Sequence, residues 1–388
     1  MEKNVYLSPC TSYEHDLIVQ AYDEILIKSG LLDFVKEGMK IGIKLNLVSH
    51  LKPEKAATTH PLLVVELCKI LIQKGAIVTI GDSPGSLFTE GILKNVYKET
   101  GMYEAEKIGA HLNFNVSTCQ KNIDGTVVHN LDCSNWLFEQ DALINFSKLK
   151  SHGMMALSAS VKNMFGTIPG ILKPEYHYRY PNHPDFANML IDLNEFYKPS
   201  LNIIDAVIGM EGNGPTQGDP RPIGLLLASK SPYALDLVAA KIIGLEVEHV
   251  HTIKESIKRN LIPNNISELN LNIEINQYII KDFKNILPGK NMEFTKFKGP
   301  FGKIISKFVS KVLTVKPKVV KKDCIGCKQC ANICPVKAIQ MKNKLPKIDR
   351  NKCIRCFCCQ EFCPKGAMIV HKNGLVKLLT KERGKNEN

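Results

Sequence analysis

Cysteine spacing is the strongest chemical signal in the chain. Nine of the thirteen cysteines lie between residues 324 and 363, and eight of them form two copies of one pattern about 29 residues apart. In each copy, two-residue gaps let three thiolates ligate one iron–sulfur cubane, while a fourth cysteine, followed by proline, ligates the other cluster. The spacing therefore predicts two [4Fe–4S] clusters with crossed ligands. Cluster one is expected on Cys324, Cys327, Cys330 and Cys363, and cluster two on Cys353, Cys356, Cys359 and Cys334.

Roughly the last 55 residues resemble the bacterial two-cluster ferredoxin family, including the proline after each fourth cysteine. The resemblance implies low-potential clusters that relay single electrons. Four thiolates also suit Zn²⁺, but the three-residue step followed by proline favours a cluster. Cys358 lies outside the register, and we expect a spare thiol packed beside a cluster, with ligand exchange as the alternative. Burial without chemistry is expected for the scattered cysteines, which are Cys10, Cys68, Cys119 and Cys133.

A second group of chemically capable residues surrounds the cation-rich segment from Asn145 to Gly170, which we expect to be a loop. Nearby, an expected strand ends close to residues 44–46, and residues 58–60 precede a helix whose N-terminus would favour an anion. If these segments meet at one edge of the sheet, they form a cationic cleft for a carboxylate or phosphate. We expect catalytic roles for Lys148, Lys150, His152, Lys162 and His60, and substrate contacts from Lys44, Asn46, Asn163 and Asn213.

In this hypothesis the lysines bind an anionic substrate, a histidine moves a proton, and the clusters deliver electrons singly. For each of these residues taken alone, the alternative to a catalytic role is an ordinary structural one. A lysine would then be a solvated surface charge, and a histidine would make hydrogen bonds that only support the fold. The chain has no GxGxxG at a strand-to-helix turn and no Walker pattern, which disfavours direct nicotinamide binding. An external electron donor or acceptor protein is therefore expected as a partner.

The elements that must position these residues alternate between strand and helix patterns. Strands are expected at 40–47, 76–80, 142–146, 201–208 and 223–228, and helices at 11–30, 61–74, 186–196 and 233–243. Thr11 and Glu14 could form a capping box for the first helix. This rhythm predicts an α/β N-terminal domain with a mainly parallel sheet, whose ligands would bind at strand carboxyl ends. A small α+β ferredoxin-like iron–sulfur domain is expected at the C-terminus.

Residues 40–240 resemble the DUF362 family of uncharacterised bacterial and archaeal proteins, which is often fused to ferredoxin modules. The resemblance is carried by GIKLNL at 42–47, SKLKSH at 147–152, VKNMFG at 161–166, GDSPG at 81–85 and EGNGP at 211–215. Ser151 stands where the family more often has threonine. A looser likeness, prompted by Lys162, Pro169-Gly170 and His183, is to the lactate racemase superfamily, in which lysine and histidines handle a nickel-pincer cofactor and a hydroxy acid.

The expected domains are 1–290 for the DUF362-like part, 291–320 for a basic linker, 321–375 for the two-cluster module and 376–388 for a polar tail. From Phe294 to Lys322 there are nine lysines and no acidic residue, and apolar residues between 304 and 313 share one helical face. We expect this amphipathic helix to dock on the larger domain, with peripheral membrane contact as the alternative. The net charge of +13 does not indicate nucleic-acid binding, because the basic stretch lacks interleaved aromatics suited to stacking and has only Phe294, Phe297, Phe301 and Phe308.

No apolar run approaches the roughly 20 residues of a spanning helix, and residues 1–7 show no secretory signal pattern. Together with the metal-ligand spacing of the cysteines, this predicts a cytoplasmic protein. The leading hypothesis is an iron–sulfur oxidoreductase or electron-transfer protein that relays electrons to or from an anionic substrate or a partner. One alternative is a non-enzymatic electron carrier whose large domain docks a partner protein. Another is a non-redox enzyme, remotely like lactate racemase, with regulatory or structural clusters.

Overall fold

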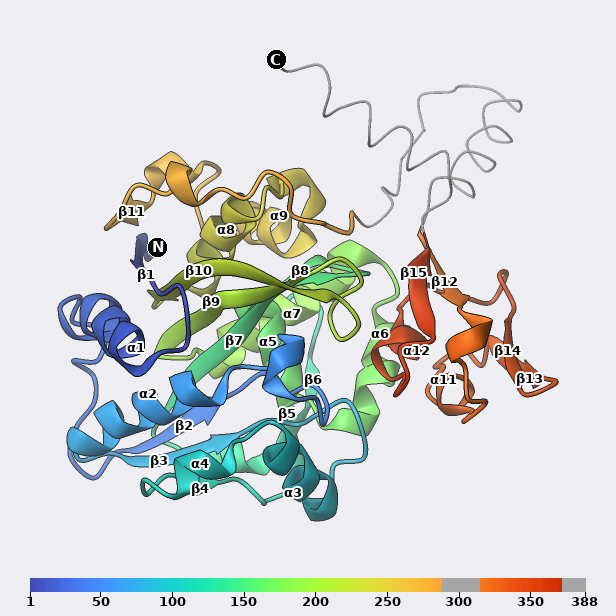
Figure 1. The fold of residues 1–388 in the computed structure, drawn as a ribbon, viewed down its shortest axis with the longest axis horizontal. Helices are drawn as coiled ribbons and strands as arrows, with labels where there is room; N and C mark the ends of the chain where they lie inside the picture. The colour runs from blue at the N-terminus through green and yellow to red at the C-terminus, as the bar shows by residue number, and fades with distance from the viewer. Residues whose placement is uncertain (288–314, 372–388) are drawn as a thin grey trace. The chain divides into compact units, whose positions relative to one another are not determined.

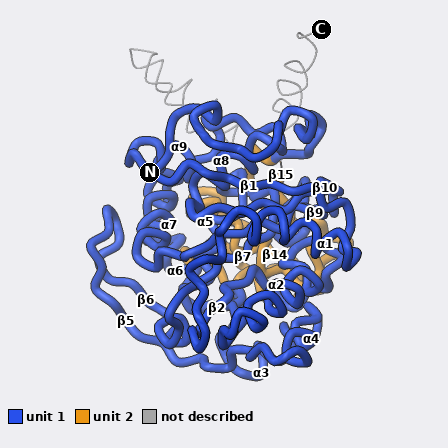
Figure 2. Tube along the Cα trace, turned by 90° about the vertical axis from the view of Figure 1, so that its left-hand side faces the viewer, with its two compact units in different colours: residues 1–285 blue, residues 286–388 orange. Residues whose placement is uncertain are grey.

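The computed structural model describes residues 1–287 and 315–371. They fall into two compact units, of which unit 1 spans Met1–Asn285 and unit 2 begins at Ile286 (Figures 1 and 2). The expected amphipathic helix at 303–313 and the polar tail at 376–388 lie outside the described residues. Across the described parts of the chain, no helix combines the length and the apolar character that crossing a bilayer requires.

Unit 1 is built on a nine-stranded sheet in the order β11-β1-β10-β9-β7-β2-β3-β4, with β8 paired to β7. Neighbours from β9 to β4 run parallel, whereas β10 is antiparallel to both β9 and β1. The prediction of an α/β domain with a mainly parallel sheet is therefore confirmed. The strands are β1 (Asn4–Pro9), β2 (Lys40–Lys44), β3 (Ile77–Gly81), β4 (His111–Leu112), β7 (Ala142–His152), β8 (Ala156–Ser158), β9 (Leu201–Glu211), β10 (Asp219–Ser229) and β11 (Asn270–Leu271), and a separate hairpin pairs β5 (Thr118–Asn122) with β6 (Asn130–Ser134).

Helices cover both faces of this sheet (Figure 1). Those from α1 to α4 share one apolar core with alternate strand residues such as Ile43 and Phe146. On the opposite face, Asp236 of α8 accepts backbone hydrogen bonds from Ser160 and Val161 of α5, which ties these two helices together. The helices are α1 (His15–Tyr22), α2 (Pro61–Gln73), α3 (Glu90–Glu99), α4 (Tyr103–Glu106), α5 (Ser160–Asn163), α6 (Lys173–Arg179), α7 (His183–Tyr197), α8 (Pro232–Ile242) and α9 (His251–Lys258).

Three sequence expectations for unit 1 were wrong. The first helix begins only at His15 and continues as a π-helical turn at Asp23–Ile27, and Glu14 caps it without a side-chain hydrogen bond, so no capping box forms. The SKLKSH segment is not a loop, because it forms the second half of β7. The strand β1 was not expected at all, although it pairs with β10 inside the sheet.

Unit 2 is a small α+β module made of two similar halves. Strand β12 (Lys316–Val319) pairs with β15 (Met368–His371), β13 (Ile339–Lys342) pairs with β14 (Leu345–Ile348), and two short helices are α11 (Gln329–Asn332) and α12 (Cys358–Glu361). Left-handed backbone conformations recur 29 residues apart, at Gly326 and Arg355 (355 − 326 = 29), at Lys328 and Phe357, and at Lys337 and Gly366. The cysteine repeat is therefore a repeat of backbone geometry, and the expected ferredoxin-like fold is confirmed.

Candidate functional site

One cavity of unit 2 is lined by the four cysteines predicted for cluster one. Cys324, Cys327 and Cys330 come from the first half, and Cys363 reaches the same cavity from the second half. The left-handed Lys328 precedes α11 and turns the chain between Cys327 and Cys330. The cavity is also lined by the apolar side chains of Ile325, Met341, Pro346, Pro364, Ala367 and Met368.

A second cavity is lined by Cys353, Cys356, Cys359 and Cys334, the four cysteines predicted for cluster two. Its crossing cysteine comes from the first half of the module. The backbone N–H of Ala338 donates to Cys334 Sγ at 3.2 Å, an interaction of the kind that tunes a cluster ligand. Cys358 lines this cavity as well, and it is buried, with 1% of its surface exposed.

The donor set fits a cluster better than a single metal ion. Among the described residues, no three His, Cys, Asp or Glu side chains converge closely enough to hold one ion. A Zn²⁺ ion with Zn–S bonds of about 2.3 Å would need such convergence. Four cysteines spread around an apolar cavity instead suit a cubane, whose iron atoms lie apart from one another.

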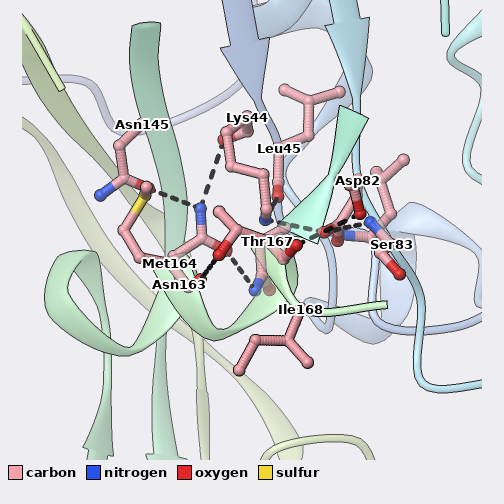
Figure 3. Close-up of polar contacts among 12 residues, drawn as sticks. Lys44, Leu45, Asp82, Ser83, Asn145, Asn163, Met164, Thr167 and Ile168 are labelled. Atoms are coloured by element: carbon pink, nitrogen blue, oxygen red, sulfur yellow. Dashed lines mark hydrogen bonds and ion pairs between the residues drawn. The ribbon is translucent and has the colours of Figure 1, made fainter. Parts of the chain in front are cut away.

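A second site of interest lies in unit 1, where the ends of β2, β3, β7 and β9 bring buried polar groups together. Lys44, at the end of β2, forms an ion pair of 2.7 Å with Asp82, which follows β3 (Figure 3). Lys44 also donates to the carbonyl of Leu45, and Asp82 accepts from the backbone N–H of Leu47. A side chain at Gly166 would collide with both charged groups, so a glycine is required where the chain crosses them.

Lys148 forms the second buried ion pair. Its ammonium lies 2.8 Å from Asp205 on β9 and donates to the hydroxyl of Tyr13. Asp205 also accepts from the backbone N–H of His60, whose ring stacks on Tyr13 with centroids 3.5 Å apart. Burial lowers the pKa of the Lys148 ammonium, and the charge of Asp205 opposes that shift. Burial also lowers the pKa of His60, to about 4, so its imidazole is neutral at pH 7.

Lys150 lies on the same face of β7 as Lys148, because strand side chains alternate with a period of two. Its ammonium donates to Asn46 Oδ1 and to the carbonyl of Ala57. Asn46 in turn donates to Asn163 Oδ1, and Asn163 donates to Asn145 Oδ1 on the opposite face of β7. Asn46 and Asn163 therefore link the two faces of the sheet past the end of β2. Figure 3 shows the hydrogen bond from Asn163 to Asn145.

Three predicted site residues lie outside these hydrogen bonds. His152, at the end of β7, uses Nδ1 to accept from the backbone N–H groups of residues 154 and 155 and so orders the turn into β8. Asn213 lies in the turn after β9, which packs against β7 through a hydrogen bond from Ser151 to the carbonyl of residue 212. Lys162 lies over the ring of Phe165, 5.6 Å from its centroid.

The comparisons with known proteins agree with both parts of this description. A family model described as "Domain of unknown function (DUF362)" matches residues 41–241, and a "4Fe-4S dicluster domain" matches residues 323–367. A thylakoid-associated protein, sll1697, of Synechocystis sp. is 30% identical over 265 residues, which cover 68% of this chain and 81% of that protein. This chain belongs to the DUF362 family. Its C-terminal module is a 4Fe-4S ferredoxin-like domain.

Two solved structures give partial matches to the DUF362 chain. The lactate racemase apoprotein from Thermoanaerobacterium thermosaccharolyticum has a TM-score of 0.40 at 14% identity and aligns over 61% of this chain and 57% of its own. A protein from Thermotoga maritima has a TM-score of 0.37 at 14% identity over 55% of this chain and 57% of its own. The DUF362 chain thus spans less than two thirds of either structure, and scores of this size assign no activity.

Sequence reasoning missed several partners in the DUF362 unit. Asp82 lies in the GDSPG segment that carries the family resemblance, so a signal for it existed. Asp205 lies inside a strand pattern, and Tyr13 precedes the first helix, so neither had a local signal. Asp205 is recognised as a partner only when the sheet order places β9 next to β7, and Tyr13 only through its hydrogen bonds with Lys148 and Asp205.

The neutral state of His60 leads to a pH prediction. The ordinary pKa of 6.5 applies in the unfolded chain, so as the pH falls from 6.5 to 4 the unfolded state binds a proton that the folded state refuses. Stability therefore decreases across this window. In H60Q we expect the slope of unfolding free energy against pH to be smaller by up to about 1 kcal/mol per pH unit.

Urea unfolding followed through the fluorescence of Trp136, the single tryptophan, measures this slope, because that residue is buried in unit 1. H15Q is the matched control, since the side chain of His15 is largely exposed. Parallel pH profiles for H60Q and the wild type would contradict the prediction.

Proposed function

We propose that this DUF362 protein is an iron–sulfur electron-transfer protein that exchanges single electrons with an external protein partner. Cys324, Cys327, Cys330 and Cys363 would hold cluster one, and Cys353, Cys356, Cys359 and Cys334 would hold cluster two. When bound, each cluster would accept and release one electron at a time. The observation that supports this proposal most directly is that each of the two cavities is lined by four cysteines, three from one half of the module and one from the other.

The protein's own residues suit such a relay. Ligands of both clusters, Cys330, Cys359 and Cys363, pack into one small apolar core with Ile339 and Met368. A shared core keeps the two cluster sites close together and excludes water from the space between them. The cysteines also suit a reducing compartment, which we propose to be the cytoplasm, because nine of them lie between residues 324 and 363 at the spacing of metal ligands.

A stoichiometric reductive titration under anaerobic conditions tests the relay. The full chain, purified without oxygen, should take up two electrons, one for each cluster, and should return them to a one-electron acceptor. Uptake of one electron would support a single cluster and contradict the two-cluster proposal. No uptake at all would contradict electron transfer as the function.

A second candidate function is an oxidoreductase whose anionic substrate binds at the sheet edge of unit 1. It is favoured by two polar atoms beside the lysines, Thr58 Oγ1 and His60 Nδ1, which are buried and have no hydrogen-bond partner among the described residues. Buried polar groups are nearly always satisfied, so these atoms suggest a missing partner. Against it, Lys44 and Lys148 are already neutralised by Asp82 and Asp205, which leaves less free positive charge for an anion.

In this second candidate Lys150 would bind the substrate, and neutral His60 would relay to it, from water, the proton that accompanies its reduction by the clusters. Reoxidation of the reduced clusters by small carboxylates and phosphate esters separates the two functions. An oxidoreductase should be reoxidised by one of them, and K150M should slow that step while K162M, changed at the lysine that lies over Phe165, should not. A carrier should be reoxidised by none of them.

A further inference from the structure

We propose that one surface of unit 2, the Cys327 face, is the docking site for an acidic redox protein, and that electrons cross to and from cluster one there. The Cys327 face consists of Ile325, Cys327, Lys328, Lys344 and Lys365. The inference rests on the proposed electron-transfer function and deepens it, because it names which cluster meets the partner, through which residues, and what charge the partner carries.

Exposure of the cysteines distinguishes the two clusters. Cys327 is the one exposed thiol among the eight predicted ligands, all of which are described. Each predicted ligand of cluster two is either buried or of intermediate exposure. Electron transfer between proteins weakens steeply with distance, so an exposed ligand marks the place where a partner's redox centre can approach most closely. That place is the edge of cluster one.

The centre of this face is apolar. Ile325 is 62% exposed and lines the same cavity as Cys327. A single exposed isoleucine is ordinary on a protein surface. Protein interfaces typically have an apolar centre and a polar rim. Beside an exposed cluster ligand, Ile325 supplies the apolar centre of such an interface.

The rim of the Cys327 face is positively charged. Lys328 and Lys365 line the cluster-one cavity, and the backbone of Lys344 packs against Gly326, next to Cys327. No acidic residue occurs from residue 324 to residue 348. Over residues 318–365 all twelve lysine and arginine side chains are exposed, against three carboxylates. Such a field steers an acidic partner into a weak, rapidly exchanging complex, as electron transfer requires.

A second basic surface provides an internal comparison. A groove beside β13 and β14 contains Lys337, Lys347, Arg350 and Lys352, but it also contains Asp349, and no predicted cluster ligand lines it. Exchanging two lysines for glutamates in this groove changes the net charge as much as the same exchange on the Cys327 face. The two exchanges also place the same strain on the backbone, because each replaces one lysine in a left-handed conformation, Lys328 in the first and Lys337 in the second.

The test uses the full chain with its clusters, and an acidic plant-type [2Fe–2S] ferredoxin as the probe. For K328E/K365E we expect both the affinity for the probe, measured by calorimetry at low salt, and the rate of electron exchange with it to fall about tenfold. For K337E/K347E we expect less than a twofold change. Reduction by methyl viologen radical, a small cation, should be undiminished in both variants.

Equal losses in the two variants would show that only net charge matters and would overturn the docking site, as would undiminished binding by K328E/K365E. Tighter binding to anionic phospholipid vesicles than to the probe, lost in K328E/K365E, would assign the face to a membrane and would also overturn the proposal. If methyl viologen radical fails to reduce the wild-type chain, the proposed function fails and the docking site with it. If it does reduce the chain, a loss of docking leaves the proposed function standing.

Discussion

The double variant C324S/C363S should keep one cluster, whereas C324S/C334S should lose both. In the crossed arrangement Cys324 and Cys363 line one cavity, so their removal leaves the four cysteines of the other cavity intact. Cys324 and Cys334 line different cavities, so the second variant leaves two incomplete sets of three. Both variants lose two thiols, and each therefore controls for the general effect of the other.

Iron per chain after anaerobic purification measures the outcome. We expect C324S/C363S to keep about half of the wild-type iron and C324S/C334S to keep little. If each copy of the cysteine pattern instead held its own cluster, the results would be reversed, since Cys324 and Cys334 belong to the same copy. Reversal would contradict the crossed ligand set, although not the presence of clusters.

Replacing Lys148 with methionine should destabilise unit 1 by about 3–5 kcal/mol, because it leaves the buried charge of Asp205 without its cation. The remaining donors to Asp205 are the hydroxyl of Tyr13 and the backbone N–H groups of His60 and Val207, and all of them are neutral. K148M/D205N removes the buried charge and keeps one of the two acceptor oxygens, so we expect it to recover more than half of the loss.

Urea unfolding followed by Trp136 fluorescence measures these changes. K94M is the control, because Lys94 and Glu90 form an exposed ion pair, and the loss of such a pair should change the stability little. A K148M variant as stable as K94M would show that Asp205 is hydrated or protonated in the native protein, and would contradict the buried ion pair.

The cysteine sites were predictable because their information is local. Three ligands of each set lie within seven residues, and the repeat carries the backbone turns that aim them, as the left-handed pairs at Lys328 and Phe357 show. Only the fourth ligand of each set is distant in sequence. The pattern itself indicates that this cysteine ligates the cluster of the other copy. The alternation of strands and helices likewise predicted the sheet, because hydrophobic periodicity is a local property.

The lysine site was predictable only in part. Parallel strands end at one edge of a sheet, and this rule brought Lys44, Asn46, Lys148, Lys150 and Asn163 together as expected. That two of these lysines would be neutralised internally could not be read from the sequence.

The reason is that the partners are distant in sequence. Asp205 is 57 residues from Lys148, and it reaches that lysine only through strand pairing. The same pairing explains why SKLKSH was taken for a loop. A strand with lysine on one face and serine on the other looks solvated until its neighbours bury both faces.

The iron and acid-labile sulfide content of the chain, purified and kept without oxygen, shows whether unit 2 holds two clusters. Two [4Fe–4S] clusters held by the cysteines of unit 2 predict eight iron atoms and eight sulfides for each chain, with reduced material showing the paramagnetic signals of cubanes. Colourless protein that contains zinc and no sulfide would contradict the account, because the eight cysteines would then serve as a structural zinc site rather than as an electron relay.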